Sequence, residues 1–171
     1  MVRLSQKILN SIEEVIGFHS DSGVIPLHEP YFENTNAWSY VKNCIDSGWV
    51  SSAGKWGEKF EDEICSYTGA SNAVVVSNGT VALRLALYLV GVREGEEVLV
   101  PPMSFVATTN AISHVGAVPH FVDIESHSLG MSYKALESRL NEIAYKKDGE
   151  VFNKKTGRRI AAVLPVHVFG N

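Results

Sequence analysis

The four residues Ser77–Thr80, with the sequence Ser-Asn-Gly-Thr, have the composition of an anion-binding turn. The β-branched run Ala73–Val76 before them is typical of a buried parallel strand, and the apolar run Val81–Val90 after them is typical of a core helix. At such a junction the first helical N–H groups have no partner within the helix, and the helix dipole adds partial positive charge. The turn therefore predicts a phosphate site, in which the glycine allows close approach and Thr80 adds a hydroxyl donor. A helix cap that binds nothing is the alternative.

Two further predicted strand ends carry residues that could do chemistry. Val98–Pro101 is followed by Ser104, which can cap the next helix, and by Phe105, which can offer a flat face to a ring or fill the core. The apolar strand Ile160–Val168 carries His167 near its end. Because ligands of open parallel sheets bind beyond the carboxyl ends of the strands, these ends form the expected binding region.

The spacing of apolar residues predicts the elements that position these strand ends. Three amphipathic helices are expected first, at the N-terminus up to Ile16, from near Asn34 to Gly48, and from Trp56 to Tyr67. From Ala73 onward strands alternate with helices, the further ones being Phe105–Val115 (helix), Ala117–Val122 (strand) and Ser132–Ile143 (helix). This alternation predicts an α/β fold with a parallel sheet and right-handed crossovers.

Two connecting segments are also expected from the sequence. Ile25–Pro30 is bounded by proline and predicts an extended segment. The polar run Lys146–Arg159 predicts an exposed hairpin or loop whose basic residues form a solvated patch. The strand Ile160–Val168 has no helix after it, although parallel sheets need covering layers on both faces. The chain is therefore expected to be part of a longer domain.

Composition narrows the class of protein. The chain has 171 residues, 45% of them apolar and 20% charged, which is typical of a soluble globular protein. Its net charge of −4 argues against a nucleic-acid partner. No secretory signal or membrane-spanning apolar run is visible, so a cytoplasmic protein without a membrane partner is expected.

The cysteines and histidines give no sign of a metal site. Cys44 and Cys65 are isolated and are interpreted as reduced thiols, with a disulfide between them as the alternative. The six histidines show no pair at helical ligand spacing, so no metal is expected.

Together these segments resemble the N-terminal part of the DegT/DnrJ/EryC1/StrS family of sugar aminotransferases. The His-Glu pair of the first segment, the Trp-Val-Ser-Ser loop and the Asn-Lys-Lys-Thr-Gly-Arg insertion resemble the LegC-like branch most. The segments that carry the resemblance are, in chain order, Ile25–Pro30, Gly48–Lys55, Ser77–Leu83, Ser104–Thr108, Phe121–Ile124 and Pro165–Gly170.

The resemblance implies a fold. It is the large domain of the type I pyridoxal-phosphate (PLP) transferases, the aspartate aminotransferase-like fold, with a mostly parallel sheet and helices on both faces. Residues 1–24 would form an N-terminal helical extension, and residues 25–171 the N-terminal part of the PLP-binding domain, with the remainder of that domain absent.

The resemblance also implies roles for individual residues. Asn78, Gly79 and Thr80 would hold the phosphate of PLP, and Phe105 would stack on its pyridine ring. Ser51 and Lys55 would contact the nucleotide-sugar substrate. The Schiff-base lysine and the acid that pairs with the pyridine nitrogen are expected beyond Asn171, so this chain is expected to contain no catalytic residue and to be inactive alone.

The implied reaction is transfer of an amino group, with glutamate as the expected donor, to a 4-keto-6-deoxy nucleotide sugar. Such products feed surface-polysaccharide or nonulosonic-acid synthesis, and the enzymes are expected to be homodimers. Two alternatives stay open at this point. One is a PLP-dependent sugar dehydratase of the same family, and the other is a non-catalytic phosphate-binding remnant.

Overall fold

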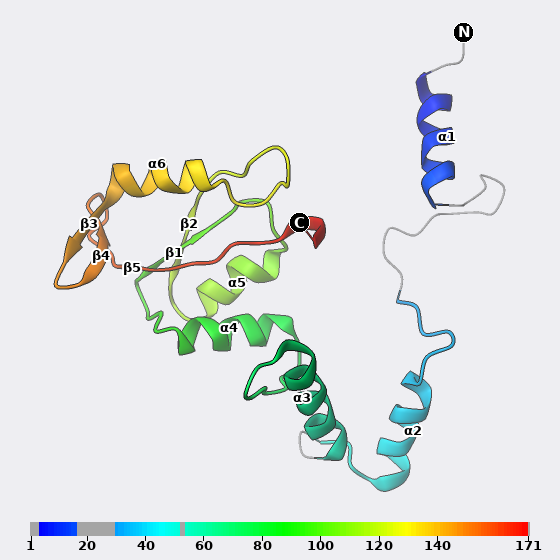
Figure 1. Ribbon diagram of the computed structural model, residues 1–171. Helices are drawn as coiled ribbons and strands as arrows, with labels where there is room; N and C mark the ends of the chain where they lie inside the picture. Colours follow the sequence, from blue (N-terminus) through cyan, green and yellow to red (C-terminus); the bar gives the residue numbers. More distant parts are fainter. Residues whose placement is uncertain (1–3, 17–29, 52–53, 171) are drawn as a thin grey trace. The chain divides into compact units, whose positions relative to one another are not determined.

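The computed structural model describes residues 4–16, 30–51 and 54–170 (Figure 1). The chain divides into two units, Met1–Glu58 and Lys59–Asn171, called here the first and second unit. The expected boundary between residues 24 and 25 lies outside the described residues, as does the predicted extended segment except for Pro30.

The first unit is helical, and its helices confirm the predicted ones. They are α1 (Leu4–Ile16), α2 (Ala37–Ser47) and the beginning of α3 (Lys55–Thr68), which continues into the second unit. The end of α2 follows from Gly48, whose φ of 73° breaks the helix while its N–H donates to the Ile45 carbonyl at 3.1 Å. The Trp56 indole donates to Asn43 Oδ1 at 3.1 Å and fixes the start of α3 against α2.

The second unit contains a parallel sheet in the order β2-β1-β5, which confirms the predicted fold class. Its sheet strands are β1 (Glu97–Val100), β2 (Val118–Phe121) and β5 (Ile160–Val163). Its helices after α3 are α4 (Gly79–Leu89), α5 (Val106–His114), α6 (Tyr133–Ile143) and a short 3-10 turn, Val168–Gly170. A separate antiparallel hairpin joins β3 (Ala144–Lys147) to β4 (Glu150–Asn153).

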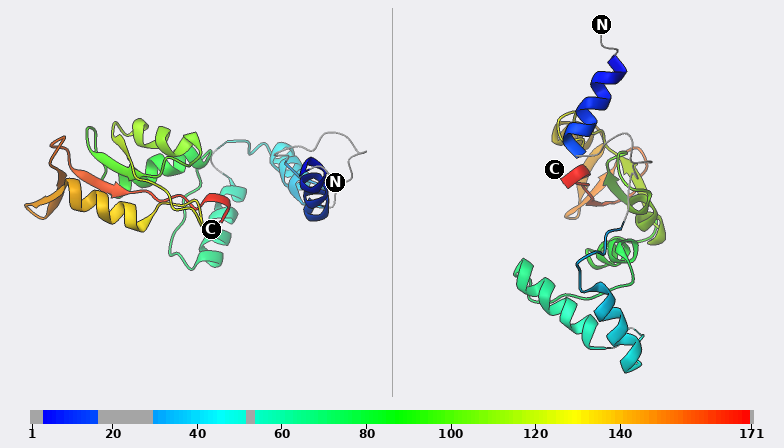
Figure 2. Two further views of the ribbon diagram at one scale, coloured as in Figure 1. Left: turned by 90° about the horizontal axis from the view of Figure 1, so that it is seen from above. Right: turned by 90° about the vertical axis from the view of Figure 1, so that its right-hand side faces the viewer.

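Helices cover both faces of this sheet, with α4 and α5 on one side and α6 on the other (Figures 1 and 2). The central strand β1 is buried along its whole length because both of its edges and both of its faces are covered. Val98 and Val100 pack with Leu87 of α4 and Ile112 of α5. Alternation along the strand turns Glu97 and Leu99 toward the opposite face.

The predicted strand over Ala73–Val76 was wrong. The segment has no regular secondary structure and joins no strand of the described chain, and Val74 is 74% exposed. The Val75 N–H donates to the Glu61 carboxylate at 2.7 Å instead of to a neighbouring strand. Both edges of β1 are occupied by β2 and β5, so this run has no central position to enter.

Three other expectations need correction. α4 is not a core helix, because only Leu87 is buried and the face that carries Leu89 is exposed. β5 ends at Val163, five residues earlier than the predicted strand end at Val168. The predicted hairpin forms, but it is not wholly solvated, because Asn153 is 1% exposed.

The predicted state of the cysteines is confirmed. Cys44 and Cys65 are half-buried free thiols. None of the helices in the described ranges is long and apolar enough to cross a membrane. No group of three or more potential metal-binding side chains occurs among the described residues.

Candidate functional site

The turn before α4 forms a capped helix start. Asn78 is the N-cap, with extended backbone angles (φ −168°, ψ 170°), and its side-chain oxygen accepts from the Val81 N–H at 3.0 Å. The cap therefore satisfies the third helical N–H and leaves the first two, those of Gly79 and Thr80, without an acceptor among the described residues. Two outward donors and the helix dipole make this end of α4 suitable for an anion.

A groove of about 390 Å³ runs beside this helix start. Phe60 and Ile64 of α3 form one wall, and residues 73–76 form another. Asn78 and Gly79 lie at its edge, and a Cβ added to Gly79 would meet no atom within 4 Å. The predicted phosphate turn thus lies beside a cavity and has open space in front of its glycine.

Phe105 stands at the start of the neighbouring helix. It is the N-cap of α5, its carbonyl accepts from the Thr108 N–H at 2.9 Å, and its side chain is 76% exposed. The core position that the sequence left open for Phe105 is therefore excluded. The predicted cap by Ser104 was wrong, since its hydroxyl donates to the Phe105 carbonyl at 3.3 Å rather than accepting from the helix.

The carboxyl ends of β1, β2 and β5 meet at one edge of the second unit. Beyond β1, the Val122 N–H donates to the Val100 carbonyl at 3.0 Å and the Leu164 N–H to the Leu99 carbonyl at 2.8 Å, so the chain leaves all three strands side by side. α4 and α5 both begin at this carboxyl edge, and the 3-10 turn near the C-terminus lies there too (Figures 1 and 2). His167 precedes that turn and is exposed.

Ser51 and Lys55 belong to the first unit. Ser51 is exposed, and Lys55 begins α3 with its ammonium 5.4 Å from the centroid of the Trp56 ring. Their predicted contact with a substrate stays a prediction.

A second cavity at the carboxyl edge escaped the sequence reasoning. It holds about 340 Å³ between the ends of β1 and β2 and the helix α6, and Asp123, Arg139 and Glu142 line it. Hydrogen bonds from Lys155 and Arg139 lower the pKa of Glu142 and keep it anionic. Asp123 lies two residues after β2, and this position at a strand end is the one sequence signal that could have indicated the cavity.

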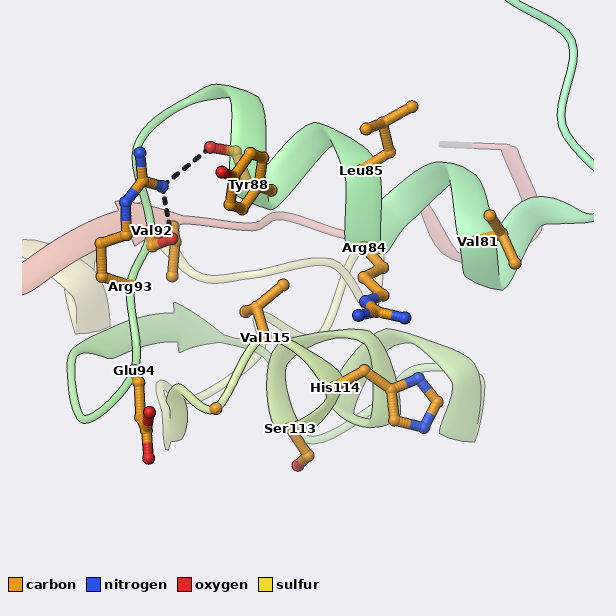
Figure 3. Close-up of a pocket in the computed structure, with 11 residues that line it drawn as sticks. Val81, Arg84, Leu85, Tyr88, Val92, Arg93, Glu94, Ser113, His114 and Val115 are labelled. Atoms are coloured by element: carbon orange, nitrogen blue, oxygen red, sulfur yellow. Dashed lines mark hydrogen bonds between the residues drawn. The ribbon is translucent and has the colours of Figure 1, made fainter.

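A wider groove of about 820 Å³ lies between α4 and α5 (Figure 3). Its walls include Val81, Leu85 and Val115, and Arg93 at one end donates to the carbonyls of Tyr88 and Val92 at 3.0 and 2.9 Å. None of the predicted site residues lines this groove, which separates it from the candidate site.

Comparison with known proteins identifies relatives of this chain. A Vibrio cholerae GDP-perosamine synthase is 40% identical to the chain over 147 residues, which are 86% of this chain and 35% of that protein. A Brucella abortus DegT DnrJ EryC1 StrS aminotransferase matches the structure with a TM-score of 0.66 and 27% identity, over 81% of this chain and 34% of that one.

A second solved structure is a Streptococcus pneumoniae protein described as a sugar aminotransferase, in its PLP form. It matches with a TM-score of 0.60 and 33% identity, over 67% of this chain and 29% of that one. The chain thus spans about a third of the length of the relatives it matches. The sequence profile of the DegT/DnrJ/EryC1/StrS aminotransferase family matches residues 33–171. The chain therefore belongs to the DegT/DnrJ/EryC1/StrS aminotransferase family.

Proposed function

We propose that this chain is the phosphate-binding N-terminal part of a PLP-dependent nucleotide-sugar aminotransferase. The observation that carries the proposal is the pair of N–H groups, on Gly79 and Thr80, that face outward at the start of α4. They lie at the carboxyl edge of a parallel sheet in a chain whose family is that of sugar aminotransferases.

The residues at this turn fit a phosphate ester. The Asn78 side chain is committed to the Val81 N–H, so the two preceding backbone N–H groups stay available as donors. The open space in front of Gly79 lets an oxyanion approach the backbone, and Thr80 can add its hydroxyl. Bound PLP would supply an electron sink for the chemistry at the substrate nitrogen.

Phe105 is proposed to stack on the pyridine ring. Its exposed side chain and its place at the start of α5, beside β1, leave a flat apolar face free at the same edge. Such stacking contributes about 1 kcal/mol beyond the area buried. The ring contact would orient the cofactor while the α4 turn anchors its phosphate.

For the intact enzyme we propose transfer of an amino group from glutamate to a 4-keto-6-deoxy nucleotide sugar. Ser51 and Lys55 would contact that substrate, and the enzyme would act as a cytoplasmic homodimer. The similarity to a GDP-perosamine synthase favours a nucleotide-sugar substrate of this kind. The LegC-like branch stays part of the proposal on the strength of the sequence resemblance.

The described residues contain no lysine in the context of a Schiff base, so we propose that the 171-residue chain binds PLP reversibly and does not transaminate. A PLP-dependent dehydratase of the same family would use the same phosphate turn. Reading the catalytic position in a full-length relative of this gene would separate the two reactions.

Equilibrium dialysis of the 171-residue chain against PLP tests the binding step. PLP is expected to bind and inorganic phosphate to compete, while pyridoxal, which lacks the phosphate, binds at least about tenfold more weakly because charge-assisted hydrogen bonds are lost. Thr80→Val should weaken PLP binding. Thr109→Val is the matched control, since the Thr109 hydroxyl bonds the Val106 carbonyl within α5.

Three results would contradict the proposal. Equal affinity for PLP and pyridoxal would show that the phosphate is not recognised. Equal losses in Thr80→Val and Thr109→Val would place the site elsewhere. Amino transfer from glutamate by the isolated chain would overturn its proposed inactivity.

A further inference from the structure

A buried carboxylate lies at the opposite end of the sheet from the candidate site. Glu97, the first residue of β1, is 2% exposed, although no step of the proposed function uses it. Its Oε2 accepts from Asn153 Nδ2 at 2.8 Å and lies 3.1 Å from His120 Nδ1. Its Oε1 accepts from the Thr156 hydroxyl at 2.6 Å. A buried carboxylate with this many donors is stable in its charged form.

The donors come from different parts of the chain. His120 is in the neighbouring strand β2, while Asn153 ends β4 and Thr156 lies in the turn that follows. Asn153 is itself 1% exposed, and its Oδ1 accepts from the Lys155 N–H at 2.9 Å, so the orientation of its amide is fixed. A single carboxylate thus links the hairpin region 144–159 to the central strand.

Other charged groups at this end face the same region from three elements. Arg159 donates to Glu150 and, at 2.9 Å, to Glu96. Both hydrogen bonds raise the pKa of the Arg159 guanidinium, and the one to Glu150 has the larger effect. Arg159, Glu96 and Glu150 are called here the surface trio. Glu96 is near the start of β1 and Glu150 begins β4, so the trio links the same elements in a more exposed position.

We propose that Glu97 is the clasp that holds the 144–159 hairpin on the amino end of the parallel sheet and that releases it in acid. The hairpin region is also attached by two backbone hydrogen bonds of 2.8 Å, from the Lys154 N–H to the Ile143 carbonyl and from the Glu97 N–H to the Arg159 carbonyl. Two more exposed ion pairs, Arg159–Glu96 and Lys155–Glu142, add to these. Protonating the carboxylate removes its charge and turns one of its two acceptor oxygens into a hydroxyl donor, so the hydrogen bonds from Asn153 and Thr156 weaken. Removing the carboxylate leaves the buried amide of Asn153 without its acceptor, which is costly in an apolar interior.

The direction of the pH effect follows from the pKa of Glu97. Burial alone would raise this pKa, but the hydrogen bonds from Asn153 and Thr156 and the adjacent His120 outweigh burial, so the pKa is lowered. A carboxyl with a lowered folded-state pKa stabilises the fold above its unfolded pKa, and this stabilisation is lost as the pH falls through the folded value. The clasp should therefore hold at neutral pH and open below the ordinary range for glutamate.

Hydrogen exchange of the whole chain tests the clasp. In Glu97→Gln at neutral pH, the amides of Asn153, Lys154 and Gly157 should lose at least about tenfold in protection, while those inside α5 keep theirs. The wild-type hairpin should lose protection selectively as the pH falls from about 7 to about 3, after correction for intrinsic exchange. The variant should retain only the weaker pH dependence of the surface trio.

Two further variants keep the test decisive. Glu142→Gln is the matched control, because Glu142 also bonds the hairpin, through Lys155, but is 50% exposed; hairpin protection should not change. Thr156→Val removes one hydrogen-bond donor and leaves the carboxylate in place, so it should lower hairpin protection by less than Glu97→Gln does. If Glu97→Gln does not fold, a loss of hairpin protection in Thr156→Val still tests the proposal. Unchanged hairpin protection in Glu97→Gln, or equal losses in α5 and the hairpin, would overturn the proposal.

Discussion

The two ends of the parallel sheet differ in how their polar groups are used. At the amino end Glu97 is buried and takes hydrogen bonds from Asn153 and Thr156 within the same chain. At the carboxyl end Gly79 and Thr80 present N–H groups without an acceptor among the described residues. No buried side-chain nitrogen or oxygen in the described ranges lacks a partner. Polar groups that the chain itself satisfies hold the fold, whereas the donors left open are exposed and available to a ligand.

The largest expected effect comes from breaking the amino end. Glu97→Ala should lower the free energy of unfolding by about 3 kcal/mol, because it leaves the buried Asn153 amide and the Thr156 hydroxyl without their acceptor. Urea denaturation followed by circular dichroism measures the change. Glu142→Ala, which removes an exposed carboxylate, should leave the urea midpoint where it is. A loss in Glu97→Ala no larger than in this control would show that the amino-end network does not stabilise the fold.

The sequence contains the local pattern behind the helix cap at the carboxyl end of the sheet but not the network at the amino end, because the two interactions differ in sequence separation. Asn78 caps a helix that starts one residue later and bonds a residue three positions away, so a local pattern contains the interaction. The partners of Glu97 lie 23, 56 and 59 residues away in His120, Asn153 and Thr156. A glutamate at the start of a strand gives no local sign that such partners exist.

The lack of long-range information in a local pattern also explains why the strand predicted over Ala73–Val76 was wrong. The β-branched run Ala73–Val76 indicates a local preference for a strand, but these residues form no regular secondary structure. The pattern carries no information on which strands flank β1, and both of those positions are filled by strands that come later in the chain. In the same way, the largely apolar sequence of α4 did not reveal that one side of this helix is exposed.

A smaller effect is expected from the helix cap at the carboxyl end. Asn78→Ala should lower the free energy of unfolding by about 1 kcal/mol, because the Val81 N–H loses its acceptor. Asn78→Ser is the matched variant, since serine also caps helices and should retain most of the stability. Both are measured by urea denaturation. If the alanine and serine variants were equally stable, the side-chain cap at residue 78 would not contribute to the stability of the fold.

The smallest effect on the fold, with the opposite sign, is expected at Gly79. A Cβ there meets no atom within 4 Å and the backbone does not have a positive φ, so Gly79→Ala should fit and stabilise the chain by about 0.5 kcal/mol through a less flexible unfolded state. The added methyl enters the open space in front of the unpaired N–H groups, where we place the phosphate, so PLP binding measured by dialysis should weaken. A variant that gains stability while losing PLP affinity would show that the open donors serve a ligand rather than the fold. Unchanged PLP affinity would place the phosphate elsewhere even if the stability rose as expected.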